Sequence, residues 1–136
     1  MKQSSHWTTR FIGLPYLPGG RDRSGVDCWG LLCLVYWEVL GVVLPELPGL
    51  VEDHEQLISR ENLALCTEGW QVQDRPTEWA AVGMSRKERI HHVGIWTEAD
   101  GGKIIHCWNG LPAVADTPKS LLLQGVRIIQ FFVWPT

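Results

Sequence analysis

One cysteine of this chain lies where a helix is expected to begin. Cys28 follows a loop of residues 16–27 that contains three glycines, and an apolar segment comes after it. The first backbone N–H groups of a helix are unpaired and carry partial positive charge, so they favour a thiolate. A thiolate is a nucleophile that can form a covalent intermediate. Cys28 is therefore a candidate nucleophile. The alternative is a buried core cysteine, which is common for this residue type.

Two histidines in the second half of the chain could assist such a nucleophile. Strand-like alternation places His92 and His106 on the same face of two successive strands. A thiol needs a base that takes its proton and returns it to the leaving amine, and that base needs a third group that orients it. We predict that Cys28, His92 and His106 fill these three roles in that order. His91 has the opposite strand parity and is expected to face the core or a sheet edge.

The same three side chains could instead bind zinc, which takes cysteine and histidine ligands in a tetrahedral arrangement. No Cys-x-x-Cys or His-x-x-x-His pair supports this alternative, so we predict no metal and no cofactor. The chain has four cysteines. Cys28 and Cys33 lie on one predicted helix, where they are poorly placed to form a disulfide, and Cys66 and Cys107 lie in apolar segments. We therefore expect reduced thiols.

The candidate nucleophile requires a helix that starts at its own position. Asp27 is a suitable N-cap, because its side chain can accept a hydrogen bond from the first turn. Apolar residues then recur at helical spacing until Gly41, which is a suitable C-terminal stop; they are Leu31, Leu32, Val35 and Val39. A turn-rich break follows, and a second helix is expected within residues 52–66.

The two histidines require a β-hairpin. We predict its strands at 92–96 and 103–108, with an earlier strand at 79–84 and a closing strand at 126–134. Residues 69–76 and 111–118 are expected to be loops, and residues 119–123 a short helical turn. Helices followed by a mostly antiparallel sheet form an α+β domain. We expect the N-terminal helix that carries Cys28 to pack on the strands that carry the histidines.

The composition fits one small domain. The chain has 136 residues, of which 45% are hydrophobic, and this is enough for one core, so we expect a single domain over residues 1–136. The net charge of −3 argues against a nucleic-acid binder. The N-terminal segment lacks the apolar stretch of a secretory signal, and no apolar segment is long enough to span a bilayer. We expect cytoplasmic synthesis and a protein or glycopeptide partner.

Two arginines lie in the loop before Cys28. The planar guanidinium groups of Arg21 and Arg23 could bind carboxylates of a substrate in a two-point manner. The alternative, which we favour, is that both are solvated loop charges.

The motifs around these residues resemble those of the NlpC-type cell-wall endopeptidases, which are papain-like cysteine peptidases. They are a Tyr-x-x-Gly-Gly stretch from Tyr16, a Gly-x-Asp-Cys stretch that ends at Cys28, a His-Val-Gly-Ile strand from His92, and a polar residue, His106, on the next strand. The resemblance implies a papain-like NlpC-type fold. It implies Cys28 as nucleophile, His92 as general base and acid, and His106 as the orienting residue. It also implies that the Tyr16 hydroxyl stabilises the oxyanion together with the backbone N–H of Cys28. The alternative for Tyr16 is a packed aromatic in a proline-rich turn.

The same resemblance implies a thiol endopeptidase that forms an acyl-enzyme thioester and cuts an amide in the peptide stem of peptidoglycan. The expected bond follows a D-glutamyl residue, next to the diamino acid. Residues 27–31 read Asp-Cys-Trp-Gly-Leu, which resembles a branch found among tail-associated proteins of bacteriophages. The implied partners are the stem peptide and phage tail assembly proteins.

We accordingly expect the protein in a virion tail or delivered to the cell wall by lysis or an injection machine. Two other functions stay open. One is an amidase or acyltransferase that acts on another substrate with the same fold, and the other is a catalytically silent structural component of a tail tip.

Overall fold

The computed structural model describes residues 6–45, 69–86, 90, 92–108 and 110–135. Three predictions lie outside these residues, namely the second helix within 52–66, the reduced state of Cys66 and the orientation of His91. The described helices are η1 (Trp7–Arg10), α1 (Cys28–Val35), η2 (Tyr36–Leu40), η3 (Ala99–Gly101) and α3 (Pro118–Leu123). Of these, η1 and η3 are 3-10 helices and η2 is a π-helix.

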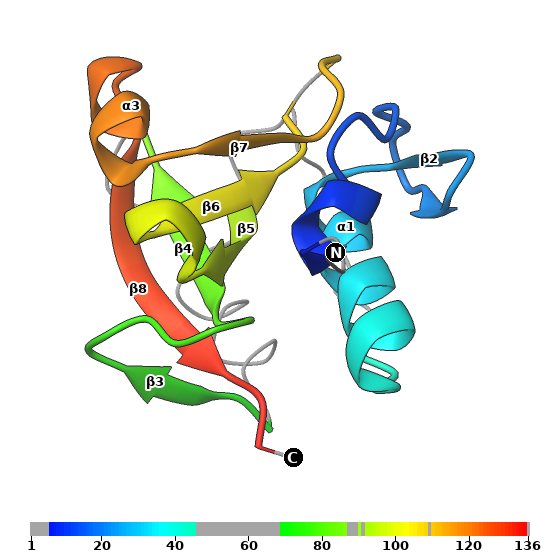
Figure 1. Ribbon diagram of the computed structural model, residues 1–136, viewed down its shortest axis with the longest axis horizontal. Helices are drawn as coiled ribbons and strands as arrows, with labels where there is room; N and C mark the ends of the chain where they lie inside the picture. Colours follow the sequence, from blue (N-terminus) through cyan, green and yellow to red (C-terminus); the bar gives the residue numbers. More distant parts are fainter. Residues whose placement is uncertain (1–5, 46–68, 87–89, 91, 109, 136) are drawn as a thin grey trace, which may run out of the picture.

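Within the described residues, six strands form one sheet in which all neighbours are antiparallel. Their order across the sheet is β3 (Gln71–Gln73), β8 (Arg127–Val133), β4 (Ala81–Ser85), β5 (His92–Thr97), β6 (Lys103–His106) and β7 (Val114–Asp116). A separate pair of short strands, β1 (Arg21–Asp22) and β2 (Gly25–Val26), shapes the loop before α1. Figure 1 shows α1 on one side of the sheet and α3 on the other. The predicted α+β fold class is confirmed.

Helix α1 begins at Cys28, as the sequence predicts. Asp27 is its N-cap, because its backbone is extended and its Oδ1 accepts a 2.7 Å hydrogen bond from the backbone N–H of Gly30. The helical path continues through η2 to Gly41, whose left-handed backbone (φ 70°) ends it. The last turn is a π-turn rather than the predicted α-helix. In this wider turn the backbone N–H of Gly41 donates to the carbonyl oxygens of Tyr36 and Trp37. Both carbonyls thereby have a hydrogen-bond donor at the helix end.

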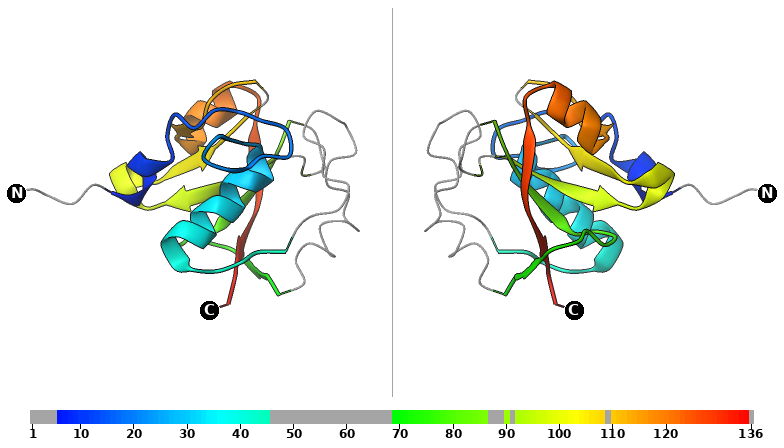
Figure 2. Two further views of the ribbon diagram at one scale, coloured as in Figure 1. Left: turned by 90° about the vertical axis from the view of Figure 1, so that its right-hand side faces the viewer. Right: turned by 90° about the vertical axis from the view of Figure 1, so that its left-hand side faces the viewer.

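The sheet separates two groups of buried apolar side chains. Helix α1 packs against β5, and its apolar residues share a cluster with Val93, Ile95 and Ile105. Strand alternation places Trp96 and Ile104 on the other face, in a second cluster with residues of β4 and α3. The left view of Figure 2 shows α1 crossing in front of the sheet. The predicted packing of the Cys28 helix on the histidine strands is confirmed.

Several strand boundaries differ from the prediction. The edge strands β3 and β7 lie within the segments predicted as loops, because an edge strand pairs on one side only and needs no buried alternating pattern. The strand expected from residue 79 begins at Ala81, since Trp79 has a left-handed backbone (φ 67°) that a strand does not accommodate. Strand β6 ends at His106 rather than at 108. Helix α3 starts at Pro118, directly after its N-cap Thr117.

A half-buried carboxylate connects η1 to the end of β5. Glu78 Oε2 accepts hydrogen bonds from Trp7 Nε1 (2.6 Å) and Thr97 Oγ1 (2.7 Å), and Oε1 accepts one from the backbone N–H of Glu98 (2.7 Å). Burial raises the pKa of this carboxyl, but the hydrogen bonds outweigh that effect and hold the pKa of Glu78 below its ordinary value. Glu78 therefore stabilises the fold as a carboxylate.

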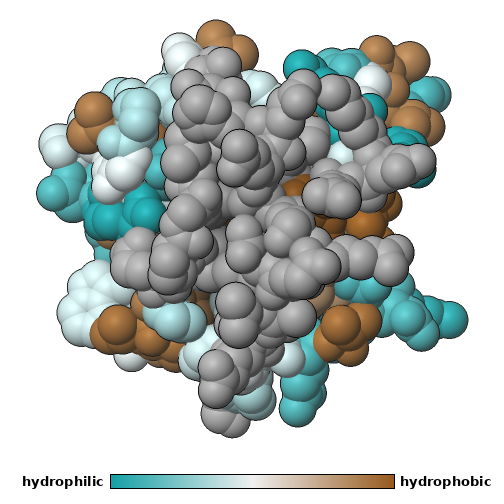
Figure 3. Space-filling model, turned by 180° about the vertical axis from the view of Figure 1, so that it is seen from behind, coloured by the Kyte–Doolittle hydropathy of each residue, from teal (hydrophilic) through white to brown (hydrophobic). Residues whose placement is uncertain are grey.

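Among the described residues, no helix is long and apolar enough to cross a membrane. Figure 3 shows the face of the molecule opposite to that of Figure 1. The hydrophobic residues coloured there lie in separate groups between hydrophilic ones.

Candidate active site

The two predicted histidines form a buried pair at the centre of the site. In the antiparallel register of β5 and β6, Ile95 lies opposite Ile105, which makes His92 and His106 diagonal neighbours on one face of the sheet. His92 Nε2 lies 2.9 Å from His106 Nδ1, and the exposed fractions of these residues are 0% and 3%. The rings are inclined at 72°. A hydrogen bond of this kind orients both rings, as a general base requires.

Gly94 provides the space that the pair occupies. It lies on β5 opposite His106, as the same register shows. A Cβ atom at this position would lie 2.6 Å from Ile104 Cγ2 and 3.1 Å from His106 Cβ. The first distance is well below a van der Waals contact. The missing side chain is therefore what lets His106 lie close to β5 and reach His92.

Asp116 extends the pair into a chain of three polar side chains. His106 Nε2 lies 2.7 Å from Asp116 Oδ2, so the hydrogen bonds run from β5 through β6 to β7. Burial lowers the pKa of His106 below its ordinary value, and the hydrogen bond and charge of Asp116 oppose that effect. Sequence reasoning missed Asp116 because it lies in a segment predicted as a loop. Two local signals were available in the sequence. Asp116 lies two residues after Val114, as on one face of a strand, and it directly precedes Thr117, the N-cap of α3.

Trp108 contacts the pair from a second direction. Its ring centroid lies 3.9 Å from that of His92 at an interplanar angle of 63°, an edge-on contact that aromatic rings favour. The guanidinium carbon of Arg86 lies 4.7 Å from the Trp108 ring centroid, so a cation contacts this ring as well. The ring of His92 is thus held by His106 and by Trp108.

Cys28 is the first residue of α1 and is buried, with an exposed fraction of 1%. The loop that leads to it is held by the carboxylate of Asp27. Besides capping the helix, this carboxylate accepts a 2.8 Å hydrogen bond from the backbone N–H of Gly19 through Oδ2. Gly30 is required beside it, since a Cβ there would lie 1.9 Å from the carbonyl oxygen of Gly20. The glycine-rich loop therefore packs directly against the helix start that carries the thiol.

Arg23 is exposed, as predicted for a solvated loop charge, whereas Arg21 is half-buried, and both form ion pairs within the chain. Arg21 Nη1 lies 2.8 Å from Asp27 Oδ1, and Arg23 Nη2 lies 2.7 Å from Glu38 Oε1. Folding brings a carboxylate of the chain itself within reach of each guanidinium, which the linear sequence does not show. Both arginines thus form ion pairs that hold the loop on α1 and η2.

The thiol helix and the histidine strands meet through residues next to the site. Cys107 Sγ donates a 3.4 Å hydrogen bond to the carbonyl oxygen of Val26. Cys107 follows His106 in the chain, and Val26 lies just before the helix cap of Cys28. Cys28 also shares an apolar cluster with Cys107 and with Val93, which follows His92. Cys28 therefore packs with Val93 and Cys107, the residues that follow the two histidines in the chain. The contact between the thiol and His92 stays a prediction.

Tyr16 is brought beside the same helix start by backbone pairing. It forms a parallel bridge with Val26, in which Leu17 N–H bonds to the Val26 carbonyl at 2.9 Å and Val26 N–H to the Pro15 carbonyl at 3.0 Å. The Tyr16 side chain is half-buried and packs against the cluster that contains Cys28. Its position is compatible with both sequence-based alternatives, so its role with the oxyanion stays a prediction.

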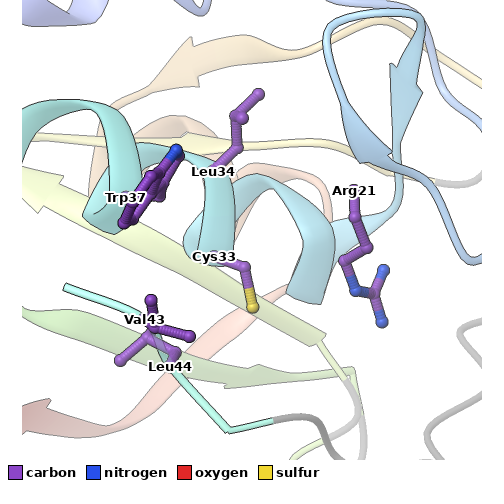
Figure 4. A pocket seen from close by; sticks show the side chains of 6 residues that line it. All are labelled: Arg21, Cys33, Leu34, Trp37, Val43 and Leu44. Atoms are coloured by element: carbon purple, nitrogen blue, oxygen red, sulfur yellow. The ribbon is translucent and has the colours of Figure 1, made fainter. Parts of the chain in front are cut away.

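A pocket of about 230 Å³ lies beside α1, away from these groups. Figure 4 shows the side chains that line it, which are Arg21, Cys33, Leu34, Trp37, Val43 and Leu44. Cys28, His92 and His106 do not line it. The pocket therefore belongs to the outer side of the helix rather than to the histidine pair.

The described residues contain no group of three or more His, Cys, Asp and Glu side chains arranged to hold a metal ion. Cys28, Cys33 and Cys107 carry reduced thiols in the structure. Cys66 lies outside the described residues. The side chains discussed above provide a thiol, two imidazoles and a carboxylate.

Two solved structures share the fold of this chain. The NlpC/P60 domain of the peptidoglycan hydrolase SagA has a TM-score of 0.55 and 23% sequence identity, over 93% of this chain and 92% of that chain. A protein of Staphylococcus aureus described as similar to a lipoprotein of the NLP/P60 family has a TM-score of 0.58 and 17% identity, over 96% of this chain and 39% of that chain. At these identities the likeness shows a shared fold. The comparison with curated proteins gives no match.

The family itself follows from the sequence. Residues 13–115 match the NlpC/P60 family, which is more than half of the chain. The matched segment contains Tyr16, Cys28, His92 and His106, whose motifs predicted this family. The enzyme class predicted with it, a cysteine peptidase of the cell-wall hydrolase type, is supported by the same match. The chain therefore belongs to the NlpC/P60 family.

Proposed function

We propose that this protein is a thiol endopeptidase that cuts an amide bond in the peptide stem of peptidoglycan. The observation that carries the proposal is the buried hydrogen bond of 2.9 Å between His92 and His106, on strands that pack against the helix beginning at Cys28. Family membership supports the same activity. Peptidoglycan as substrate is supported by the described activity of SagA, whose NlpC/P60 domain has the same fold.

The first half-reaction forms a thioester on Cys28. Nε2 of His92 forms the hydrogen bond to His106, so Nδ1 of His92 is the ring nitrogen that can accept the proton of the thiol. It accepts the proton of Sγ, and the thiolate attacks the carbonyl carbon of the scissile amide. His92 then donates this proton to the leaving nitrogen as the C–N bond breaks. The products of this step are a free amine and an acyl-enzyme thioester.

The second half-reaction releases the acyl group. His92 takes a proton from water, and the resulting nucleophile attacks the thioester carbon. The C–S bond breaks as His92 returns this proton to Sγ, which restores the thiol, and the stem peptide leaves as a carboxylic acid that ionises in solution. Both tetrahedral intermediates carry negative charge on one oxygen. We assign the backbone N–H of Cys28 and the hydroxyl of Tyr16 as its donors, each of which would contribute about 3 kcal/mol.

The position of the bond and the biological setting rest on motif resemblance. The family resemblance favours cleavage after a D-glutamyl residue, next to the diamino acid. The Asp-Cys-Trp-Gly-Leu stretch at 27–31 favours the branch found among phage tail proteins. We therefore propose that phage tail assembly proteins deliver the enzyme to the cell wall as part of a virion tail.

The test is digestion of purified peptidoglycan with mass analysis of the fragments. The wild-type protein is expected to release stem-peptide fragments with new amino groups, and Cys28→Ala is expected to release none. Cys33→Ala is the matched control, because Cys33 lies on the same helix but lines the outer pocket. It is expected to cut at the wild-type rate.

Two results would overturn the proposal in different ways. Release that persists in folded Cys28→Ala would exclude the thiol mechanism. No release by the wild-type protein would favour the alternatives. Formation of a Cys28 adduct with a small thioester or amide substrate would then indicate an amidase or acyltransferase, and no turnover of any kind would indicate a structural tail-tip component.

A further inference from the structure

We infer that Asp116 is a positioning residue that sets the tautomers of both site histidines. This inference rests on the proposed cysteine hydrolase function. Asp116 lies immediately beyond the segment that matches the family, which ends at residue 115. It does not contact the thiol in this scheme. It acts on the nucleophile through His106 and His92.

The carboxylate of Asp116 determines which ring nitrogen carries the proton in His106 and in His92. An ionised carboxylate only accepts hydrogen bonds, so the 2.7 Å contact requires a proton on Nε2 of His106. In the neutral ring, Nδ1 of His106 is then an acceptor, and the 2.9 Å contact requires a proton on Nε2 of His92. His92 therefore keeps its lone pair on Nδ1. This is the tautomer in which His92 can act as the base for Cys28.

The carboxylate is itself held in place. Asp116 lies on β7, where it pairs with Ile104 of β6. Its second oxygen, Oδ1, accepts a hydrogen bond of 3.1 Å from the Ser120 hydroxyl on α3. Each oxygen thus has its own partner, which fixes the plane of the carboxylate. The side chain of Asp116 is only 18% exposed and that of His106 only 4%, so water competes little for this bond.

The negative charge of Asp116 also matters when His92 holds the proton of the thiol. A charged imidazole inside the protein is costly unless a compensating charge lies nearby. Through His106, Asp116 supplies that compensation while the proton stays on His92. A residue with this role changes the rate of the chemical step more than it changes the binding of substrate.

The experiment compares Asp116→Ala with Ser120→Ala in the full chain. Ser120→Ala removes the partner of Oδ1 but leaves the bond to His106, so it is the matched control. Nitrogen-15 NMR of the histidine rings reports which nitrogen carries the proton, without any need for activity. In the wild-type protein both rings are expected to carry it on Nε2. In Asp116→Ala we expect His106 to populate both tautomers, and in Ser120→Ala the wild-type pattern.

Kinetics on peptidoglycan provide the second measurement. Asp116→Ala is expected to lower kcat about 100-fold with KM changed by less than about twofold. Ser120→Ala loosens the carboxylate but leaves its bond to His106, so we expect a much smaller loss of kcat, about threefold or less. If Asp116→Ala does not fold, Asp116→Asn retains the shape of the side chain without its charge, and the same shifts in tautomer and kcat are expected in the same direction.

Wild-type tautomers or wild-type kcat in a folded Asp116 variant would overturn the inference. Equal losses of kcat in Asp116→Ala and Ser120→Ala would also overturn it, because they would indicate a structural role for the end of β7. If the wild-type protein cuts no peptidoglycan, the proposed function fails. The histidine tautomers then decide the role of Asp116 on their own.

Discussion

Substitution of Gly94 by alanine tests whether the histidine pair depends on the space beside β5. The added Cβ would lie 2.6 Å from Ile104 Cγ2 and 3.1 Å from His106 Cβ. Normal carbon contacts are about 3.5–4.0 Å, so the added Cβ must move away from Ile104 Cγ2 by roughly 0.9–1.4 Å and from His106 Cβ by roughly 0.4–0.9 Å. A shift of that size lengthens the bond between His92 and His106, now 2.9 Å, beyond about 3.4 Å, where it is weak.

Two measurable losses follow from this displacement. Overpacking of a buried strand lowers the free energy of unfolding by about 1–3 kcal/mol. Misplacement of a catalytic group by about 1 Å lowers kcat by roughly 100-fold. We therefore expect Gly94→Ala to remain folded at room temperature and to lose most of its activity. Urea unfolding gives the stability, and the rate of fragment release from peptidoglycan gives kcat.

Gly83→Ala is the matched control for this substitution. Its added Cβ would lie 2.7 Å from Ile90 Cδ1, which is the end of a flexible side chain. Gly83 pairs with Val93 rather than with a histidine, and both Val93 and Ile90 belong to the apolar cluster that includes residues of α1. We expect a smaller loss of stability and wild-type kcat. The reasoning fails if Gly94→Ala retains the wild-type rate, or if Gly83→Ala loses as much activity.

Three further predictions concern the thiol, its helix cap and the carboxylate under η1. Iodoacetamide near neutral pH should label Cys28 faster than Cys33, as followed by peptide mass analysis, because the helix start favours the thiolate; equal rates would argue against an activated thiol. Asp27→Ala removes the cap and two further hydrogen bonds, so urea unfolding should show a loss of about 1–2 kcal/mol; unchanged stability would contradict the capping role. Glu78→Gln should be less stable than the wild type at neutral pH by about 1–2 kcal/mol, because hydrogen bonds to a charged group are lost. The pKa of Glu78 is lowered in the folded protein, so its contribution is present above the unfolded value near 4.5 and is lost as the pH falls through the folded value. The difference between Glu78→Gln and wild type should therefore shrink below pH 4.5, and a difference that grows there would refute this assignment.

Much of the framework follows from short stretches of the chain. Asp27 before an apolar helix, with Gly41 after it, is a local signal, since capping involves residues within one turn. The alternation around His92 and His106 is equally local, because side chains of a strand point to opposite faces in turn. These patterns predicted the helix start and the shared face of the two histidines before any contact between them was known.

Other features depend on which segments pair in three dimensions. The short edge strands β3 and β7 have no periodic pattern of their own and form because β8 and β6 offer free edges to them. The ion pair of Arg21 with Asp27 forms when the loop folds back onto the helix start. The left-handed backbone of Trp79, which delays β4, is a further result of the packing around it rather than of its residue type.

The site itself shows the same division. Residue types and spacing were enough to propose Cys28, His92 and His106 as nucleophile, base and orienting group, because thiols and imidazoles suit these roles and the strand period sets the faces. The contact from His106 to Asp116 depends on the register of β6 with β7. Such a register is a long-range property, since it is set by pairing between strands whose relative shift no local pattern specifies. Which ring nitrogen of His92 and of His106 carries the proton can therefore be inferred only from the folded sheet.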